Sequence, residues 1–129
     1  MVYDLNTDKW IILESRLNHA WADGIVFNDD HHIYVAGGIS DHWINSIEKY
    51  SLSSNEWVVV NITMNQRLDG LTAIRTQYDS SGFIIFGGKS ANWTYNHDIQ
   101  YLYDLGTDKP NLQLMNSIDI DEDVVINRE

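Results

Sequence analysis

The chain has 129 residues, 43% of them hydrophobic and 12% aromatic, so it is long and apolar enough for one packed domain. Nineteen acidic residues against eight basic ones give a net charge of −11, a balance that nucleic acids and anionic membranes repel. The chain has no cysteine, which excludes disulfides, thiolate metal ligands and cysteine nucleophiles. We expect no nucleic-acid partner, no membrane partner, no metal and no cofactor.

The predicted elements, taken in chain order, begin as short β-strands separated by turns. An opening ribbon covers residues 2–5 and 9–13. Residues 33–36 form an apolar run that starts after the polar turn 28–30 and stops at Gly37-Gly38. A short apolar run of this kind, ended by glycine, is typical of a buried strand.

The strands that follow complete one unit, and the same order then returns. A third strand ends at Tyr50, and a fourth begins at Trp57 after a polar turn. In the second unit the apolar run is 83–86, the third strand ends at Tyr103, and the fourth covers 112–115. No segment sustains a helical period, so each unit is predicted to be a four-stranded antiparallel sheet in an all-β chain.

Three sequence markers recur at an interval of about fifty residues, which defines an internal repeat. The markers are YDLNTDKW, YSLSSNEW and YDLGTDKP at 3–10, 50–57 and 103–110; IYVAGG and FIIFGG at 33–38 and 83–88; and RLNHA and RLDGL at 16–20 and 67–71. A small sheet with two apolar faces must stack on copies of itself, and radial stacking gives a β-propeller. The Trp of each fourth strand is expected to pack between neighbouring blades.

The ordered set of markers resembles the Kelch repeat over about residues 1 to 115. The positions that carry the resemblance are Arg16, His19, Ala20, Gly37, Gly38, Tyr50 and Trp57, then Arg67, Gly87, Gly88 and Tyr103, with Tyr3 and Trp10 in the opening ribbon. Two positions depart from the pattern. Gly70 replaces the His of the first unit, and Pro110 replaces the Trp that ends the other copies.

The resemblance implies an arc of a Kelch-type propeller built from antiparallel four-stranded blades. Its predicted parts are the last two strands of a preceding blade at 1–13, complete blades at 16–62 and 67–115, and an acidic tail at 117–129. Three interpretations remain open: a fragment of a larger Kelch protein, which we favour, a chain whose copies self-associate to complete a ring, or a lasting open arc. Uncovered blade faces would favour self-association.

Kelch propellers commonly serve as adaptors or scaffolds, so the resemblance implies a protein partner. The candidate partner-binding residues in the loops after the glycine pairs are Asp41, His42, Trp43, Asn92, Trp93, Tyr95 and His97. Tyr and Trp are enriched where proteins bind partners. The alternative is that these aromatic side chains pack back onto their own blades.

A second group of candidates, Arg16, His19, Arg67 and Asp69, is expected at the start of each innermost strand. By resemblance, these positions lie near the central channel and its mouth. The structural alternative, which we favour, is that Arg16 and Arg67 bond to backbone carbonyls or acidic groups of the next blade. Trp10 is expected to pack against the first complete blade.

No catalytic residue is predicted, because no arrangement of Ser, His and Asp and no phosphate-binding glycine loop is present. The run 29–32, Asp-Asp-His-His, is interpreted as a polar hairpin tip, because consecutive strand residues point to opposite faces. The alternative functions are a piece of a Kelch-fold enzyme acting on carbohydrates, of the galactose-oxidase or sialic-acid-handling kind, and a truncated product without independent function.

The expected compartment is the cytoplasm. The longest unbroken apolar runs have four residues, whereas a membrane-spanning helix needs about 20. The first residues also lack the basic start and apolar core of a signal peptide.

Overall fold

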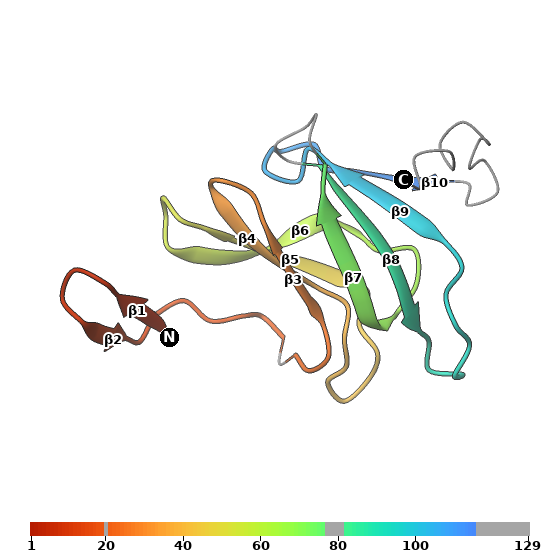
Figure 1. Cartoon of the computed structure of the whole chain (residues 1–129), viewed down its shortest axis with the longest axis horizontal. Coiled ribbons are helices and arrows are strands. Elements are labelled where there is room, and N and C mark those ends of the chain that lie inside the picture. The colour runs from red at the N-terminus through yellow and green to blue at the C-terminus, as the bar shows by residue number, and fades with distance from the viewer. Residues whose placement is uncertain (20, 77–81, 116–129) are drawn as a thin grey trace, which may run out of the picture.

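The computed structural model describes residues 1–19, 21–76 and 82–115, and within them it is all β (Figure 1). The predicted tail 117–129, the marker Ala20 and most of the turn before the 83–86 strand lie outside these residues. The described part contains no helix long and apolar enough to cross a membrane. Its strands are β1 Val2–Asp4, β2 Lys9–Ile11, β3 Ile25–Asn28, β4 His32–Ala36, β5 Ser46–Ser51, β6 Glu56–Thr63, β7 Asp69–Arg75, β8 Phe83–Lys89, β9 Ile99–Tyr103 and β10 Asn111–Met115.

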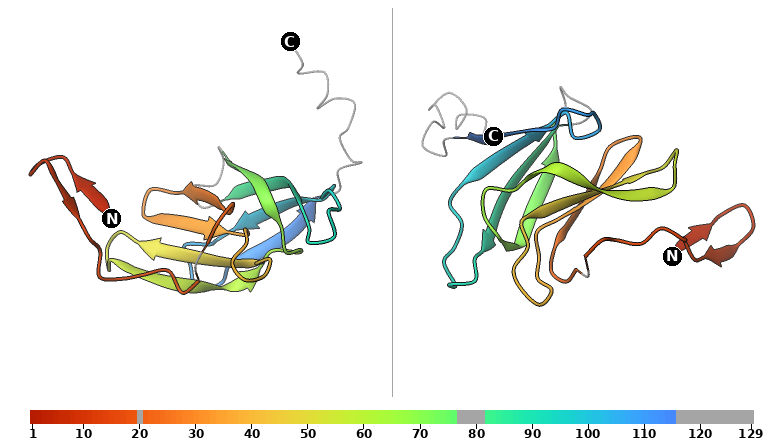
Figure 2. Two further views of the ribbon diagram at one scale, coloured as in Figure 1. Left: turned by 90° about the horizontal axis from the view of Figure 1, so that it is seen from below. Right: turned by 180° about the vertical axis from the view of Figure 1, so that it is seen from behind.

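Eight of these strands form two four-stranded antiparallel sheets, which confirms the predicted fold class. Strands β3 to β6 lie side by side in chain order and form blade 1, and strands β7 to β10 do the same in blade 2. The remaining pair, β1 and β2, is a separate hairpin. Figure 2 shows this hairpin set apart from blade 1 and joined to it by an extended segment.

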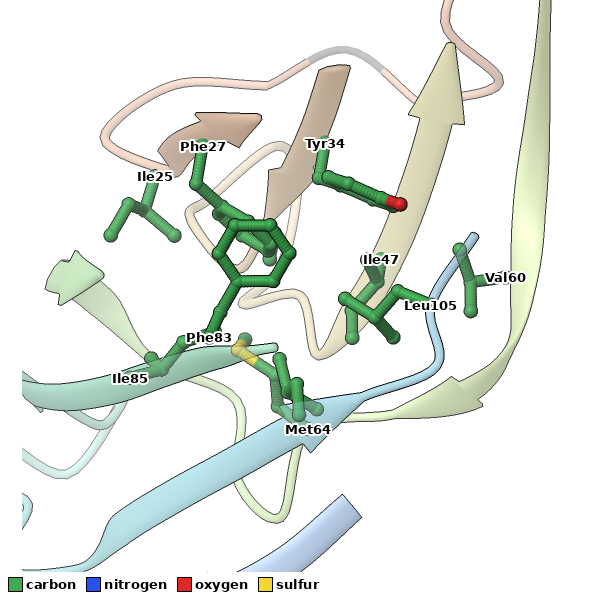
Figure 3. Close-up of a cluster of buried hydrophobic side chains, with 11 residues drawn as sticks. Ile25, Phe27, Tyr34, Ile47, Val60, Met64, Phe83, Ile85 and Leu105 are labelled. Atoms are coloured by element: carbon green, nitrogen blue, oxygen red, sulfur yellow. The ribbon is translucent and has the colours of Figure 1, made fainter. Parts of the chain in front are cut away.

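The hydrophobic core lies between the two blades. Phe83 of blade 2 is fully buried, and its ring centroid lies 4.6 Å from that of Phe27 in blade 1 (Figure 3). Phe27 stacks in turn on Tyr34 at 5.2 Å. The cluster comprises Ile25, Phe27, Tyr34, Ala36, Ile47, Val60 and Met64 from blade 1 and its connection, with Phe83, Ile85, Leu102 and Leu105 from blade 2. Each blade therefore buries one face against the other.

Backbone hydrogen bonds also join the blades where the innermost strands begin. Gly38 N donates to Leu68 O at 2.7 Å, and Gly70 N donates to Asp23 O at 3.1 Å. Gly38 has a φ of 90°, and a Cβ there would lie 2.5 Å from Ala22 O. Only glycine fits this turn, because any side chain would clash with the backbone beside it.

The strand pairing corrects the sequence alignment of the two units by one position. Ile33 pairs with Tyr50 in blade 1, whereas the equivalent Phe83 pairs with Leu102 in blade 2. Leu102 therefore occupies the place of Tyr50, and Tyr103 points to the opposite face. The alignment on Tyr103 was wrong because the similar turn sequences outweighed the alternation of faces along the strand.

The expected packing of Trp10 against blade 1 is wrong, whereas Trp57 lies on a face of blade 1 that no other blade covers among the described residues, so its packing between blades stays a prediction. Trp57 is half-buried and packs across the strands on Tyr50, with ring centroids 5.2 Å apart. Trp10 is 67% exposed and contacts Tyr3 within its own hairpin, at 5.1 Å. Both are cross-strand aromatic pairs, which stabilise a hairpin without needing a neighbouring blade.

Candidate partner-binding loops

Three connections leave the blades at one shared edge. They are the β4–β5 loop at 37–45, the β8–β9 loop at 90–98 and the β6–β7 connection at 64–68, and Figure 1 shows the first two reaching the lower edge of the molecule. Alternate connections of an antiparallel sheet lie at the same end, so the topology itself brings these loops together.

The β8–β9 loop presents two aromatic side chains to solvent. Trp93 is 72% exposed and Tyr95 is 73% exposed. The base of the loop is fixed by Asn96, whose Nδ2 donates to Gly87 O at 2.9 Å, while its Oδ1 accepts from Asp98 N at 3.0 Å. Both side chains stay largely exposed, although the Trp93 ring contacts the Lys89 ammonium at the end of β8, so packing onto the blade does not account for this loop.

The β4–β5 loop behaves differently. Trp43 is half-buried, and the next residue, Ile44, is only 3% exposed. Ser40 N donates to His42 O at 3.0 Å, and the exposed His42 contacts the carboxylate of Asp41. For Trp43 the packing interpretation holds in part, whereas Asp41 and His42 reach solvent.

A cleft of about 500 Å³ joins the two loops across the blade boundary. Its lining includes five of the predicted residues and three others: Asp41, His42, Trp43, Arg67 and Asn92, with Gln66, Ser90 and Ala91. A second cleft of about 550 Å³ contains Asp69 and Tyr95, together with Asp23, Gly24, Gly70, Gly88 and Lys89. His97 is exposed in the β8–β9 loop outside both linings.

Arg16 and His19 lie away from these clefts. Both precede β3 by several residues, so the expectation that they start an innermost strand is wrong. His19 packs on blade 1, where its Nδ1 lies 3.1 Å from Glu48 Oε2. Within the described residues, the guanidinium groups of Arg16 and Arg67 make no hydrogen bond or ion pair, so their expected anchoring role is also wrong.

Sequence reasoning missed Glu48, a fully buried carboxylate in β5. Its oxygens accept hydrogen bonds from Asn18 N at 2.6 Å, Asn18 Nδ2 at 2.9 Å, His19 N at 3.1 Å and Trp21 Nε1 at 2.8 Å. Burial raises the pKa of Glu48, but these hydrogen bonds outweigh it and hold the pKa below its usual value. The available signal was strand alternation, which places Glu48 on the same face as Tyr50.

The Asp-Asp-His-His run forms a structured hairpin tip around a buried Asp29. Asp29 Oδ1 accepts from His31 N at 2.8 Å and His32 N at 2.7 Å, and Oδ2 accepts from the Tyr34 hydroxyl at 2.7 Å. Burial raises the pKa of Asp29, but the hydrogen bonds lower it further than burial raises it. Among the described residues, no three His, Asp or Glu side chains are arranged to hold a metal ion.

Four-stranded antiparallel sheets packed face to face in this way define blades of a β-propeller. A family model of the Kelch motif matches residues 26–62, which covers blade 1 from β3 to β6. The solved structure of YjhT, a Kelch-type propeller protein, is similar with a TM-score of 0.72 at 10% sequence identity. The chain therefore has a Kelch motif in blade 1 and the fold of part of a β-propeller.

The similarity to YjhT covers 92% of this chain and 43% of the YjhT chain, so this chain spans less than half of that propeller. In sequence, no curated protein matches the chain.

Proposed function

We propose that this chain is a protein-binding segment of a larger Kelch-type propeller and that the loop edge binds the partner. The observation that carries the proposal is the exposure of Trp93 and Tyr95 on a loop whose base is held by hydrogen bonds. Large aromatic side chains with a polar group supply much of the binding energy at protein interfaces. A rigid base reduces the entropy lost when such a loop binds.

A binding role is favoured over the carbohydrate-enzyme alternative by the kind of side chain that the loop exposes. Aromatic rings contribute contact area, whereas catalysis needs a positioned acid, base or nucleophile. The fold does not decide between them, because one fold hosts many functions.

The test is selection of a displayed random peptide library on the purified chain. We expect the enriched peptides to lose at least tenfold in affinity for the double variant Trp93→Ala, Tyr95→Ala. Trp10→Ala is the matched control, because Trp10 is similarly exposed but lies on the β1–β2 hairpin. Equal binding by the double variant, or a loss confined to Trp10→Ala, would contradict the proposal.

A further inference from the structure

Among the described residues, one carboxylate oxygen of Asp69 is buried without a hydrogen-bond partner. Asp69 begins β7 and is only 7% exposed, and its Oδ1 has no hydrogen-bond partner within the described residues. A buried carboxylate that is neither paired nor hydrogen-bonded is costly, so nearly all such groups in proteins have a partner. Glu48, which is fully buried, has its hydrogen bonds supplied by the chain. Within the described residues, Asp69 Oδ1 has none.

The space beside Asp69 is open enough to admit another group. The side chain lines the 550 Å³ cleft together with Asp23, Lys89 and Tyr95. At Gly70, which has a φ of 69°, a Cβ would meet no atom within 4 Å. The cleft therefore has the carboxylates of Asp23 and Asp69 and the exposed ring of Tyr95, and the space beside Gly70 is open.

Lys89, which lines the same cleft, and Arg67, two residues before Asp69, form no ion pair with it among the described residues. Lys89 is the backbone partner of Asp69 across β7 and β8, but its ammonium lies 4.1 Å from the centroid of the Trp93 ring. The Lys89 ammonium, at the end of β8, contacts the Trp93 ring, so the carboxylate of Asp69 can receive a group from outside the chain.

We infer that Asp69 binds a cationic side chain, an ammonium or guanidinium group, presented by the protein partner. This inference rests on the proposed function and adds the partner's chemistry to it. Charge-assisted hydrogen bonds to a carboxylate are about twice as strong as neutral ones. The net charge of −11 attracts a basic segment toward the chain, and Tyr95 offers a ring face beside the cleft.

The test uses a short peptide, acetyl-Gly-Arg-Gly-amide, titrated into the full chain and followed by the backbone amide signals of Gly70, Gly88 and Lys89. The matched control peptide carries citrulline, which has nearly the same shape as arginine without its charge. We expect the arginine peptide to shift these signals and the citrulline peptide to bind at least tenfold more weakly. Asp69→Asn is expected to lose the same factor, whereas Asp108→Asn, which removes an exposed carboxylate outside both clefts, keeps binding.

Equal binding of arginine and citrulline peptides by the native chain would overturn the inference, whether or not Asp69→Asn folds. So would an Asp69→Asn variant that binds arginine as the native chain does, or a neutral methyl glycoside that shifts the same signals more strongly. The proposed function fails separately. If library peptides need Trp93 and Tyr95 but bind Asp69→Asn normally, the loop binds a partner and the cationic contact is wrong.

Discussion

At the scale of the residue, Glu48 links the segment before blade 1 to the blade itself. Donors of Asn18, His19 and Trp21, which precede blade 1, converge on this one buried carboxylate of β5. Gln100 has the equivalent place in blade 2 and accepts from Asn65 N at 2.7 Å. The same position thus holds the incoming connection in both blades, with a charged group in one and a neutral group in the other.

Glu48→Gln is expected to lower the free energy of unfolding by about 2 to 3 kcal/mol at pH 7, because charge-assisted hydrogen bonds are replaced by weaker ones. The folded-state pKa of Glu48 is depressed, so its contribution to stability is complete above the ordinary pKa of a Glu side chain and is lost as the pH falls through the folded-state pKa. Urea denaturation from pH 7 to 3 should show the gap between native chain and variant closing. The exposed Glu56→Gln is the control, and a gap that stays constant with pH would contradict the prediction.

At the scale of the element, the Tyr50–Trp57 and Tyr3–Trp10 pairs differ in burial, and so in how much they stabilise their hairpins. Tyr50 is 4% exposed beneath Trp57, whereas Tyr3 and Trp10 are 38% and 67% exposed. An isolated two-stranded hairpin is marginally stable in water, so the β1–β2 pair adds little to the unfolding of the blades.

Trp57→Ala is expected to cost about 2 kcal/mol, less than the 3 to 5 typical of a fully buried Trp, because Trp57 is only half-buried. Trp10→Ala should cost less than about 1 kcal/mol. Urea denaturation monitored by circular dichroism measures both losses of unfolding free energy. Equal losses for the two variants would mean that the hairpin packs on the blades.

Phe83 and Phe86 lie on opposite faces of β8, so their replacement by Ala is expected to destabilise the chain to different extents. Phe83 is fully buried in the core between the blades, whereas Phe86 lies on the other face and is half-buried. Phe83→Ala should cost about 3 to 5 kcal/mol, and Phe86→Ala about 1. Differential scanning calorimetry of both variants tests which face of blade 2 meets blade 1. A larger loss from Phe86→Ala would reverse that assignment.

The sequence predicted the sheets well because the fold depends on redundant local signals. Apolar runs ended by Gly-Gly located β4 and β8, and the turns before Trp57 and after Tyr103 located the outer strands. Side-chain environments were less predictable. Whether Trp43 packs inward and Trp93 points to solvent depends on the loop conformation. That Lys89 does not pair with Asp69 depends on the side-chain conformation that brings its ammonium to the Trp93 ring.

At the scale of the whole molecule, each blade covers one face of the other and leaves its second face without a blade among the described residues. On blade 2, Ile74 is 53% exposed opposite Ile84, and Met115 is 43% exposed. Beside blade 1, a hollow of about 670 Å³ lies between Ile33 and Trp57 of the blade and residues of the preceding segment that include Leu13 and Leu17. Exposed apolar surfaces of this kind mark sites of association.

The central claim is that these two blades form an arc of a Kelch-type propeller whose end faces associate with further blades. Sedimentation equilibrium of the 14.9 kDa chain over a range of concentrations tests it most directly. We predict a mass that rises with concentration and that falls toward the monomer in Ile74→Asp but not in Thr107→Asp, which adds the same charge on an exposed turn. A monomer at every concentration, with a single cooperative melt, would contradict the account.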